Sequence, residues 1–246
     1  MQTFYFTDPG KVRSHNEDSV TIISNDNKEF VLAIADGMGG HKAGEIASSI
    51  AIEHIITSFN NLETIGTKED AIDWLREIVK EINDQIFAYA KKHPESKGLG
   101  TTLVIAIKTE DYILYGNIGD SSGYVIKNGI LHKVTKDHTY VGMLISNGKL
   151  TEEGAKNHPG KNLLTRALGA NDPIEIDIFD IDTSVKGLFL CSDGLTNMLT
   201  AEQIEKVLNS NLSIEESVVK LVKKANLRGG TDNISIAYLK KESGES

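Results

Sequence analysis

The chain has 246 residues, of which 39% are hydrophobic and 25% charged, the composition of a globular protein with a sizeable core. Its formal net charge of −9, without a cluster of lysines or arginines, argues against a nucleic-acid-binding protein. The one cysteine excludes a disulfide framework, and no apolar run approaches the ~20 residues that span a bilayer.

The chain contains no internal repeat, low-complexity tract or linker, so we expect one domain over residues 1–246 with a disordered tail at about 241–246. The N-terminus lacks the basic region and apolar stretch of a signal peptide. We therefore expect a cytoplasmic protein without membrane insertion, and a monomer by default.

The first part of the chain predicts strands at 3–7, 19–24 and 30–35, followed by helices at about 42–60 and 68–92. The second helix has the clearest periodicity in the chain, a single apolar stripe that is more typical of a core than of a cofactor site. The stripe consists of Ala71, Trp74, Leu75, Ile78, Ile82, Ile86 and Tyr89.

The later part of the chain again alternates strands with helices. Asn128-Gly129 is a type I′ hairpin signal, and Thr200 and Ser213 each begin a helix with capping-box spacing. Residues 139–165 are expected to form an irregular insertion with small helices. Strands are expected at 101–108, 112–117, 123–135, 174–181, 187–191 and 234–239. Such blocks of strands with paired helices between them predict an α+β fold with mostly antiparallel sheet.

Aspartates stand at the ends of four of these strands: Asp36, Asp120, Asp193 and Asp232. A single Asp-Gly pair is usually only a turn, but four acids that meet at one edge would repel one another unless cations neutralised them. Oxygen ligands without clusters of His or Cys favour Mg²⁺ or Mn²⁺ over Zn²⁺. Two such ions about 4 Å apart can activate water to hydrolyse a phosphate ester, which requires no nucleophilic triad.

Three residues near the N-terminus extend this hypothesis. The guanidinium of Arg13 is suited to holding a phosphate dianion, although a surface arginine is the alternative interpretation. Glu17 and Asp18 follow it and could orient metal-bound waters, or could simply belong to a solvated loop.

Seven motifs then occur in order along the chain. They are Asp8-x-Gly10-x-x-Arg13-x-x-Asn16-Glu17-Asp18, Ala35-Asp36-Gly37-Met38-Gly39-Gly40-His41, Gly98-Leu99-Gly100-Thr101-Thr102, Gly119-Asp120-Ser121, Leu164-Thr165-Arg166-Ala167-Leu168-Gly169, Cys191-Ser192-Asp193-Gly194-Leu195-Thr196 and Thr231-Asp232-Asn233. Over nearly its whole length the chain resembles the type 2C metal-dependent serine/threonine protein phosphatases, in their compact bacterial form.

The resemblance implies a four-layer α-β-β-α sandwich with two or three Mn²⁺ or Mg²⁺ ions in a cleft between two sheets. It implies that Asp36 bridges two metals, that the Gly37 carbonyl binds the first, and that Asp193 and Asp232 bind the second. Asp120, with Asp193, would hold a third metal.

The resemblance also assigns roles beyond direct metal ligation. Glu17 and Asp18 would act through water, Arg13 would hold the phosphate, and residues 139–165 would form a flap beside the cleft. The implied substrates are phosphoserine and phosphothreonine proteins, and the implied partner is a cognate eukaryotic-type serine/threonine kinase.

The chain departs from the family pattern at three positions. Met38 replaces a histidine proposed as general acid in animal members, Ser122 stands where bacterial relatives have arginine, and Gly142 stands where the flap has asparagine. The general acid is therefore open between His41 and a metal-bound water, and His41 could instead be structural. A phosphatase of small phosphorylated metabolites and a non-catalytic partner-binding module are the alternative functions.

Overall fold

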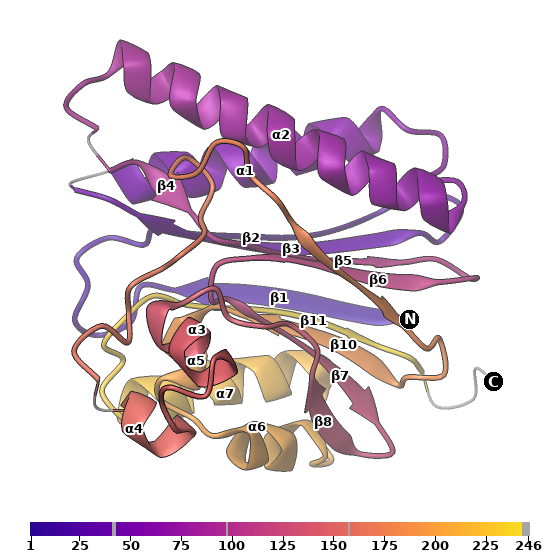
Figure 1. Ribbon diagram of the computed structural model, residues 1–246. Helices are drawn as coiled ribbons and strands as arrows, with labels where there is room; N and C mark the ends of the chain where they lie inside the picture. The colour runs from indigo at the N-terminus through magenta and orange to yellow at the C-terminus, as the bar shows by residue number, and fades with distance from the viewer. Residues whose placement is uncertain (41–42, 97, 157, 243–246) are drawn as a thin grey trace.

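The computed structural model describes residues 1–40, 43–96, 98–156 and 158–242. Two antiparallel sheets lie face to face, and each is covered on its outer side by helices (Figure 1). The expected α+β fold, a four-layer α-β-β-α sandwich, is confirmed.

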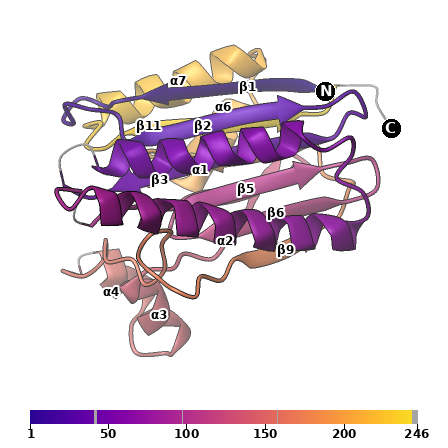
Figure 2. The same ribbon diagram turned by 90° about the horizontal axis from the view of Figure 1, so that it is seen from above.

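The first sheet has the strand order β2-β3-β5-β6-β9, with the short β4 paired to β3. Its strands are β2 Asp18–Ser24, β3 Phe30–Met38, β4 Gly100–Thr101, β5 Leu103–Lys108, β6 Ile113–Ile118 and β9 Asp177–Ile181. The long helices α1, Ala43–Asn60, and α2, Lys68–Lys92, lie across its outer face (Figure 2).

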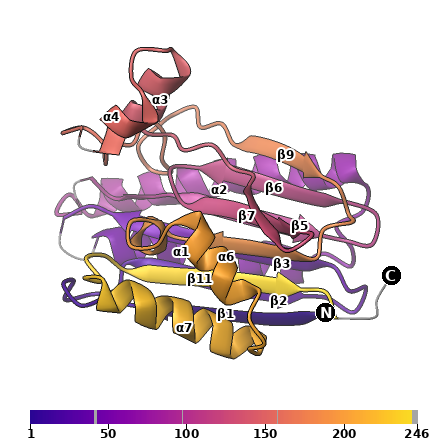
Figure 3. The same cartoon turned by 90° about the horizontal axis from the view of Figure 1, so that it is seen from below.

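The second sheet has the strand order β1-β11-β10-β7-β8. Its strands are β1 Gln2–Asp8, β7 Ser122–Lys127, β8 Ile130–Lys133, β10 Gly187–Cys191 and β11 Ile234–Lys240. Helices α6, Ala201–Leu208, and α7, Ile214–Leu227, cover its outer face (Figure 3). Three further short helices are α3, Tyr140–Ser146, α4, Glu152–Lys156, and α5, Asp193–Thr196.

Strand alternation decides which side chains lie between the sheets, because successive residues of a strand point to opposite faces. On β3, Leu32 and Ile34 belong to the inter-sheet core, whereas Val31, Ala33 and Ala35 pack with the core under α1 and α2. The expected stripe on α2 faces that same core, with Ala71, Trp74, Leu75, Ile78, Ile82 and Ile86 buried and Tyr89 partly buried. The position after Ile34 on the inter-sheet face is Asp36.

The sequence-based boundaries differ from the structure in three informative places. Strand β3 continues through Asp36 to Met38, because Gly37 and Met38 pair with β4. Asp193-Gly194 begins the short helix α5 instead of forming only a turn. Strand β9 begins at Asp177, not at residue 174. The expected capping boxes at Thr200 and Ser213 are both present, and residues 139–165 contain α3 and α4.

Candidate functional site

One end of the inter-sheet space is polar although its middle is apolar. The inter-sheet faces that carry Leu32 and Ile34 on β3 and Leu188 and Leu190 on β10 continue to Asp36 and Ser192, by strand alternation. A cleft of about 620 Å³ opens at this end. It is lined by Arg13, Glu17, Asp36, Gly37, Met38, Gly39, Thr102, Asp120, Asn162, Leu163, Leu164, Thr165, Arg166, Ala167, Ala170, Asn171, Asp193 and Asp232.

Asp36 is held in place through its backbone. Its amide donates to the Thr102 hydroxyl at 3.1 Å, and its carbonyl accepts the Thr102 amide at 2.9 Å and the Thr101 hydroxyl at 2.9 Å. The Asp36 side chain carries none of these bonds, so its carboxylate is available to the cleft.

Gly37 occupies a position that no other residue fits. A Cβ there would lie 2.1 Å from the Gly44 carbonyl oxygen and 2.6 Å from that of Glu17. The Gly37 amide donates to the Glu17 carbonyl at 3.1 Å, which joins the end of β3 to the N-terminal loop. The close approach explains why Asp is followed by Gly here, beyond any need for a turn.

Asp18 lies opposite Asp36 in the antiparallel β2–β3 pair, and it is buried. The hydroxyl of Ser192, also buried, donates to Asp18 Oδ2 at 2.8 Å and accepts the Ser235 amide at 2.9 Å. Ser192 therefore connects the two sheets and fixes the Asp18 carboxyl, which underlies the cleft rather than lining it.

Four carboxyl groups at this end disfavour one another's ionisation. Burial, helped by the nearby charges of Asp193 and Asp232, raises the pKa of Asp18 to about 7, although hydrogen bonds from Ser192 and Ser235 lower it. Burial and the charges of Asp18 and Asp193 raise the pKa of Asp36 well above its usual value. Burial and a neighbouring aspartate likewise raise the pKa of Asp120 to about 7 and that of Asp193 to about 6. The cluster therefore requires added positive charge to be fully ionised at neutral pH.

Arg13 lines the cleft and is paired with Asp232. Its Nη2 donates to Asp232 Oδ2 at 2.9 Å, and this hydrogen bond raises the pKa of the half-exposed guanidinium. Asp232 Oδ1 accepts the Asn233 amide at 3.0 Å. One guanidinium donor is used by Asp232, which leaves other donors of the planar group for a ligand in the cleft.

Asn233 fastens the loop that carries Arg13 and Glu17. Its Oδ1 accepts the Glu17 amide at 2.8 Å, and its Nδ2 donates to the carbonyls of Pro9 and His15, each at 2.9 Å. The side chain is 4% exposed. Burial is also the main cause of the raised pKa of Glu17.

Asp120 follows β6 in a loop attached to the base of the 139–165 segment. The Gly119 amide donates to Nδ1 of His138 at 3.1 Å, and the His138 amide donates to the Gly119 carbonyl at 2.9 Å. Nε2 of His138 lies 3.1 Å from Asp177 Oδ2, and Arg166 donates to the other oxygen of Asp177 at 2.6 Å. This network joins the Asp120 loop to both ends of the segment.

The donor set fits hard divalent cations. Oδ1 of Asp18 and Oδ1 of Asp193 are buried without a hydrogen-bond partner, which is costly for carboxylate oxygens unless a cation or a proton accompanies them. Only oxygen donors converge, as Mg²⁺ and Mn²⁺ prefer. In the described parts of the chain no group of three or more His, Cys, Asp or Glu side chains forms a ready-made metal site. Asp232, for one, is paired with Arg13.

The departures from the family pattern have distinct surroundings. Met38 lines the cleft, whereas Ser122 is buried and lies opposite Cys191 in the β7–β10 pair. Gly142 accepts no side chain easily, since a Cβ would lie 2.9 Å from the Asp137 carbonyl oxygen. His41, the candidate general acid, lies outside the described residues.

The structure brings together Arg13, Glu17, Asp36, Gly37, Asp120, Asp193 and Asp232 at one cleft, with Asp18 beneath it. The sequence reasoning did not assign roles to Ser192, Asn233 and Thr102. The alternation of side chains along a strand could have identified Ser192, because it falls two residues after Leu190 on the face that packs in the inter-sheet core. A polar residue at such a position indicates that the core gives way to a polar site.

Comparison with known proteins gives one consistent result. The sequence profile of the family described as "Protein phosphatase 2C" matches residues 11–227. The chain is 37% identical to the serine/threonine phosphatase stp of Listeria monocytogenes, over 98% of this chain and 96% of that protein. It is 34% identical to protein phosphatase PhpP of Streptococcus pneumoniae, over 97% of each.

Solved structures agree with this result. The serine/threonine phosphatase of S. agalactiae superposes with a TM-score of 0.93 at 33% identity, over 98% of this chain and 99% of that one. Serine/threonine phosphatase Stp1 of Staphylococcus aureus gives a TM-score of 0.92 at 34% identity, over 98% and 95% of the two chains.

Proposed function

This chain belongs to the protein phosphatase 2C family and is a serine/threonine phosphatase, and we propose that the carboxylate cleft between its sheets is the catalytic centre. The family depends on Mn²⁺ or Mg²⁺. The observation that carries the proposal is the set of four carboxyl groups with raised pKa values, two of which have buried oxygens without partners. Divalent cations would neutralise this cluster.

We assign the ligands residue by residue, with two or three ions per chain. Asp36 would be shared by two ions, the Gly37 carbonyl would serve the first, and Asp193 and Asp232 would serve the second. Asp120 would contribute to a third with Asp193, and Glu17 would act through water. Bound ions would supply the Lewis acidity and the charge compensation that hydrolysis of a phosphate monoester needs.

The chain's own side chains would position the reactants. Arg13 would donate to the phosphate oxygens in the cleft, while Asn233 holds the loop that carries Arg13 in place. Ser192 would hold the Asp18 carboxyl in one orientation through Oδ2, while Oδ1 is buried without a hydrogen-bond partner. Arg13 would thus serve to bind the substrate, and Asp18 would serve to orient the attacking water.

The proton for the serine or threonine alkoxide would come from His41 or from water, because Met38 carries no proton donor. A nitrophenolate leaves without a proton. If His41 is the acid, His41→Ala slows hydrolysis of a phosphothreonine peptide far more than hydrolysis of p-nitrophenyl phosphate. Equal losses on the two substrates would assign the proton to water and a structural role to His41.

The substrates are phosphoproteins, and we propose that a cognate serine/threonine kinase is among them. We also propose that residues 1–246 form one catalytic domain, with 139–165 as a flap: Asn162, Leu163 and Leu164 line the cleft. A comparison of a phosphothreonine protein with sugar phosphates, each with Mn²⁺, tests the substrate class. Preferential turnover of the protein is expected, and preferential turnover of the sugar phosphates would contradict it.

A further inference from the structure

A second pocket lies at the opposite end of the sandwich from the carboxylate cleft. Its volume is about 540 Å³, within the range of sites for small ligands. Its lining residues are Met1, Asn27, Lys28, Phe30, Lys108, Glu110 and Lys241. They come from the residue before β1, the turn before β3 with the first residue of β3, the end of β5 with the following turn, and the residue after β11.

The separation of the two sites follows from the strands that they share. Strand β3 has Phe30 at the pocket and Asp36 at the cleft, six residues apart, which corresponds to roughly 20 Å along a strand. Strand β11 runs from Ile234, beside Asp232, to Lys240, beside Lys241. The pocket is therefore a site of its own, at the other mouth of the inter-sheet space.

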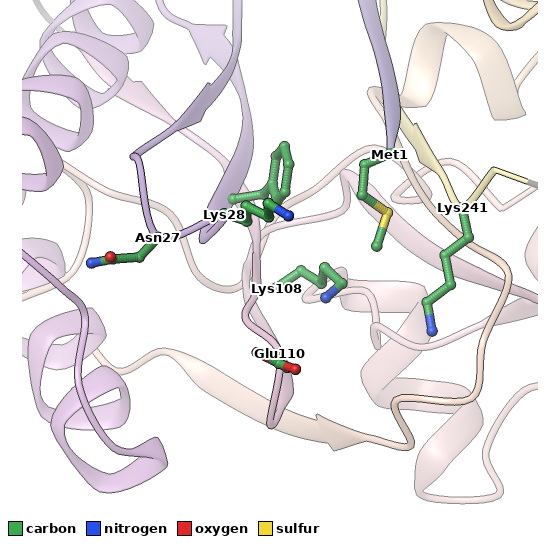
Figure 4. A pocket seen from close by; sticks show the side chains of 7 residues that line it. Met1, Asn27, Lys28, Lys108, Glu110 and Lys241 are labelled. Atoms are coloured by element: carbon green, nitrogen blue, oxygen red, sulfur yellow. The ribbon is translucent and has the colours of Figure 1, made fainter. Parts of the chain in front are cut away.

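The charge of the pocket is opposite to that of the protein. Three lysines and one glutamate line it, a balance of +2, whereas the whole chain has a formal net charge of −9. Figure 4 shows Lys28, Lys108 and Lys241 around one opening, with the side chain of Met1 between Lys28 and Lys241 in that view. Such a local reversal of sign favours an anionic ligand.

The three lysines differ in how they are held. Lys108 is only 9% exposed, and its ammonium donates to the Thr109 carbonyl. Nζ of Lys241 donates to the Thr183 carbonyl at 2.8 Å. Within the described residues neither Lys28 nor Lys241 forms an ion pair with a carboxylate. Glu242, the acid next to Lys241, lies 3.6 Å from the amino group of Met1.

Lys28 is presented by a tight turn. Its φ of 60° is in the left-handed region, which a lysine adopts only where its surroundings fix it. The turn is closed by the Lys28 amide donating to the Asn25 carbonyl at 3.1 Å and the Asn25 amide donating to the Glu29 carbonyl at 3.2 Å. The backbone thus places the Lys28 side chain at the rim of the pocket.

From this arrangement we propose that the pocket binds a small phosphate or phosphonate dianion that carries an apolar group. The anion would contact Lys28, Lys108 and Lys241, and the apolar group would pack on the side chains of Phe30 and Met1. This binding site is independent of the catalytic centre. If the pocket binds no anion, the proposed phosphatase function is unaffected.

Phenylphosphonate is a suitable probe because its P–C bond is not hydrolysed by a phosphatase. The titration uses chelator-treated protein, in which the carboxylate cleft holds no divalent cation that could bind the probe. We expect saturable binding with amide shifts in NMR at Phe30 and Lys108, and unchanged affinity in Arg13→Ala. No saturable binding, or shifts confined to the cleft, would overturn the proposal.

Two double variants with the same net charge show whether any loss of binding is specific to the lysines of the pocket. K28Q/K241Q removes two cations from the pocket, whereas K220Q/K223Q removes two exposed cations from α7. We expect at least about a hundredfold weaker phenylphosphonate binding in the first and parent affinity in the second, since two charge-assisted hydrogen bonds, each worth about tenfold or more, are lost only in the first. Equal affinities in the two would refute the assignment.

One further variant guards against a folding defect in K28Q/K241Q, which also loses the bond from Lys241 to Thr183. Lys28→Glu reverses the charge at the rim without removing any described side-chain hydrogen bond. It is expected to weaken phenylphosphonate binding at least as much as a neutral change, with an unchanged unfolding midpoint and unchanged phosphatase activity. Parent affinity in this variant would overturn the proposal.

Discussion

Asn233→Ala tests whether Asn233 holds the loop that carries Arg13 and Glu17, without changing either of those residues. The substitution removes three hydrogen bonds of 2.8–2.9 Å that join a nearly buried side chain to Glu17, Pro9 and His15. At about 0.5–1.5 kcal/mol for each bond, the free energy of unfolding should fall by about 1.5–4.5 kcal/mol. Because the freed loop carries Arg13 and Glu17, the KM for a phosphothreonine peptide should rise as well.

Urea denaturation and steady-state kinetics measure the two effects, with Tyr115→Phe as the control. That change removes one buried hydrogen bond, from the Tyr115 hydroxyl to the Tyr124 carbonyl at 2.8 Å, within the inter-sheet core. It should lower stability by about 1 kcal/mol and leave KM unchanged. If Asn233→Ala had parent stability and parent KM, Asn233 would not hold the loop.

Three further changes test individual roles. Arg13→Ala should chiefly raise KM, by roughly ten- to a hundredfold. The reason is that a phosphate that keeps its charge is bound similarly in the substrate and in the transition state. A KM within about twofold of the parent would make Arg13 a surface residue without a role in binding. Asp120→Ala should lower turnover and remove only a weak Mn²⁺ site in calorimetry, and unchanged turnover would leave Asp120 as a turn residue. Asp18 has a folded-state pKa of about 7, raised above its unfolded value, so the folded state binds the proton more tightly. Chelator-treated protein should therefore lose stability as pH rises from about 5 to 7. Asp18→Asn should flatten that slope in urea denaturation, and an unchanged slope would exclude Asp18 as a source.

The fold was accessible from the sequence because its strongest patterns are local. The stripe on α2 and the capping boxes at Thr200 and Ser213 depend only on neighbouring residues, and the structure has all of them. Strand ends were less accessible, because pairing decides them: β3 extends to Met38 only through its contact with β4.

The ordered motifs pointed to acids that the structure brings together at one cleft, but local patterns did not give the surroundings of these acids. The bond from Ser192 to Asp18 joins residues 174 positions apart, and those from Asn233 reach more than 200 positions back. Likewise, the pairing of Asp232 with Arg13 depends on how the N-terminal loop folds over β11. Such contacts exist only once both sheets have formed.

Metal dependence of phosphothreonine peptide hydrolysis, with Asp36→Ala alongside the parent, tests the catalytic centre most directly. The parent should be inactive after chelation and recover on addition of Mn²⁺ or Mg²⁺. Asp36→Ala should stay inactive with either ion, because no neighbouring carboxylate can take the place of one shared by two ions. Substantial activity of the parent in excess chelator, or of Asp36→Ala with Mn²⁺, would contradict the assignment of this cleft as a metal-dependent catalytic centre.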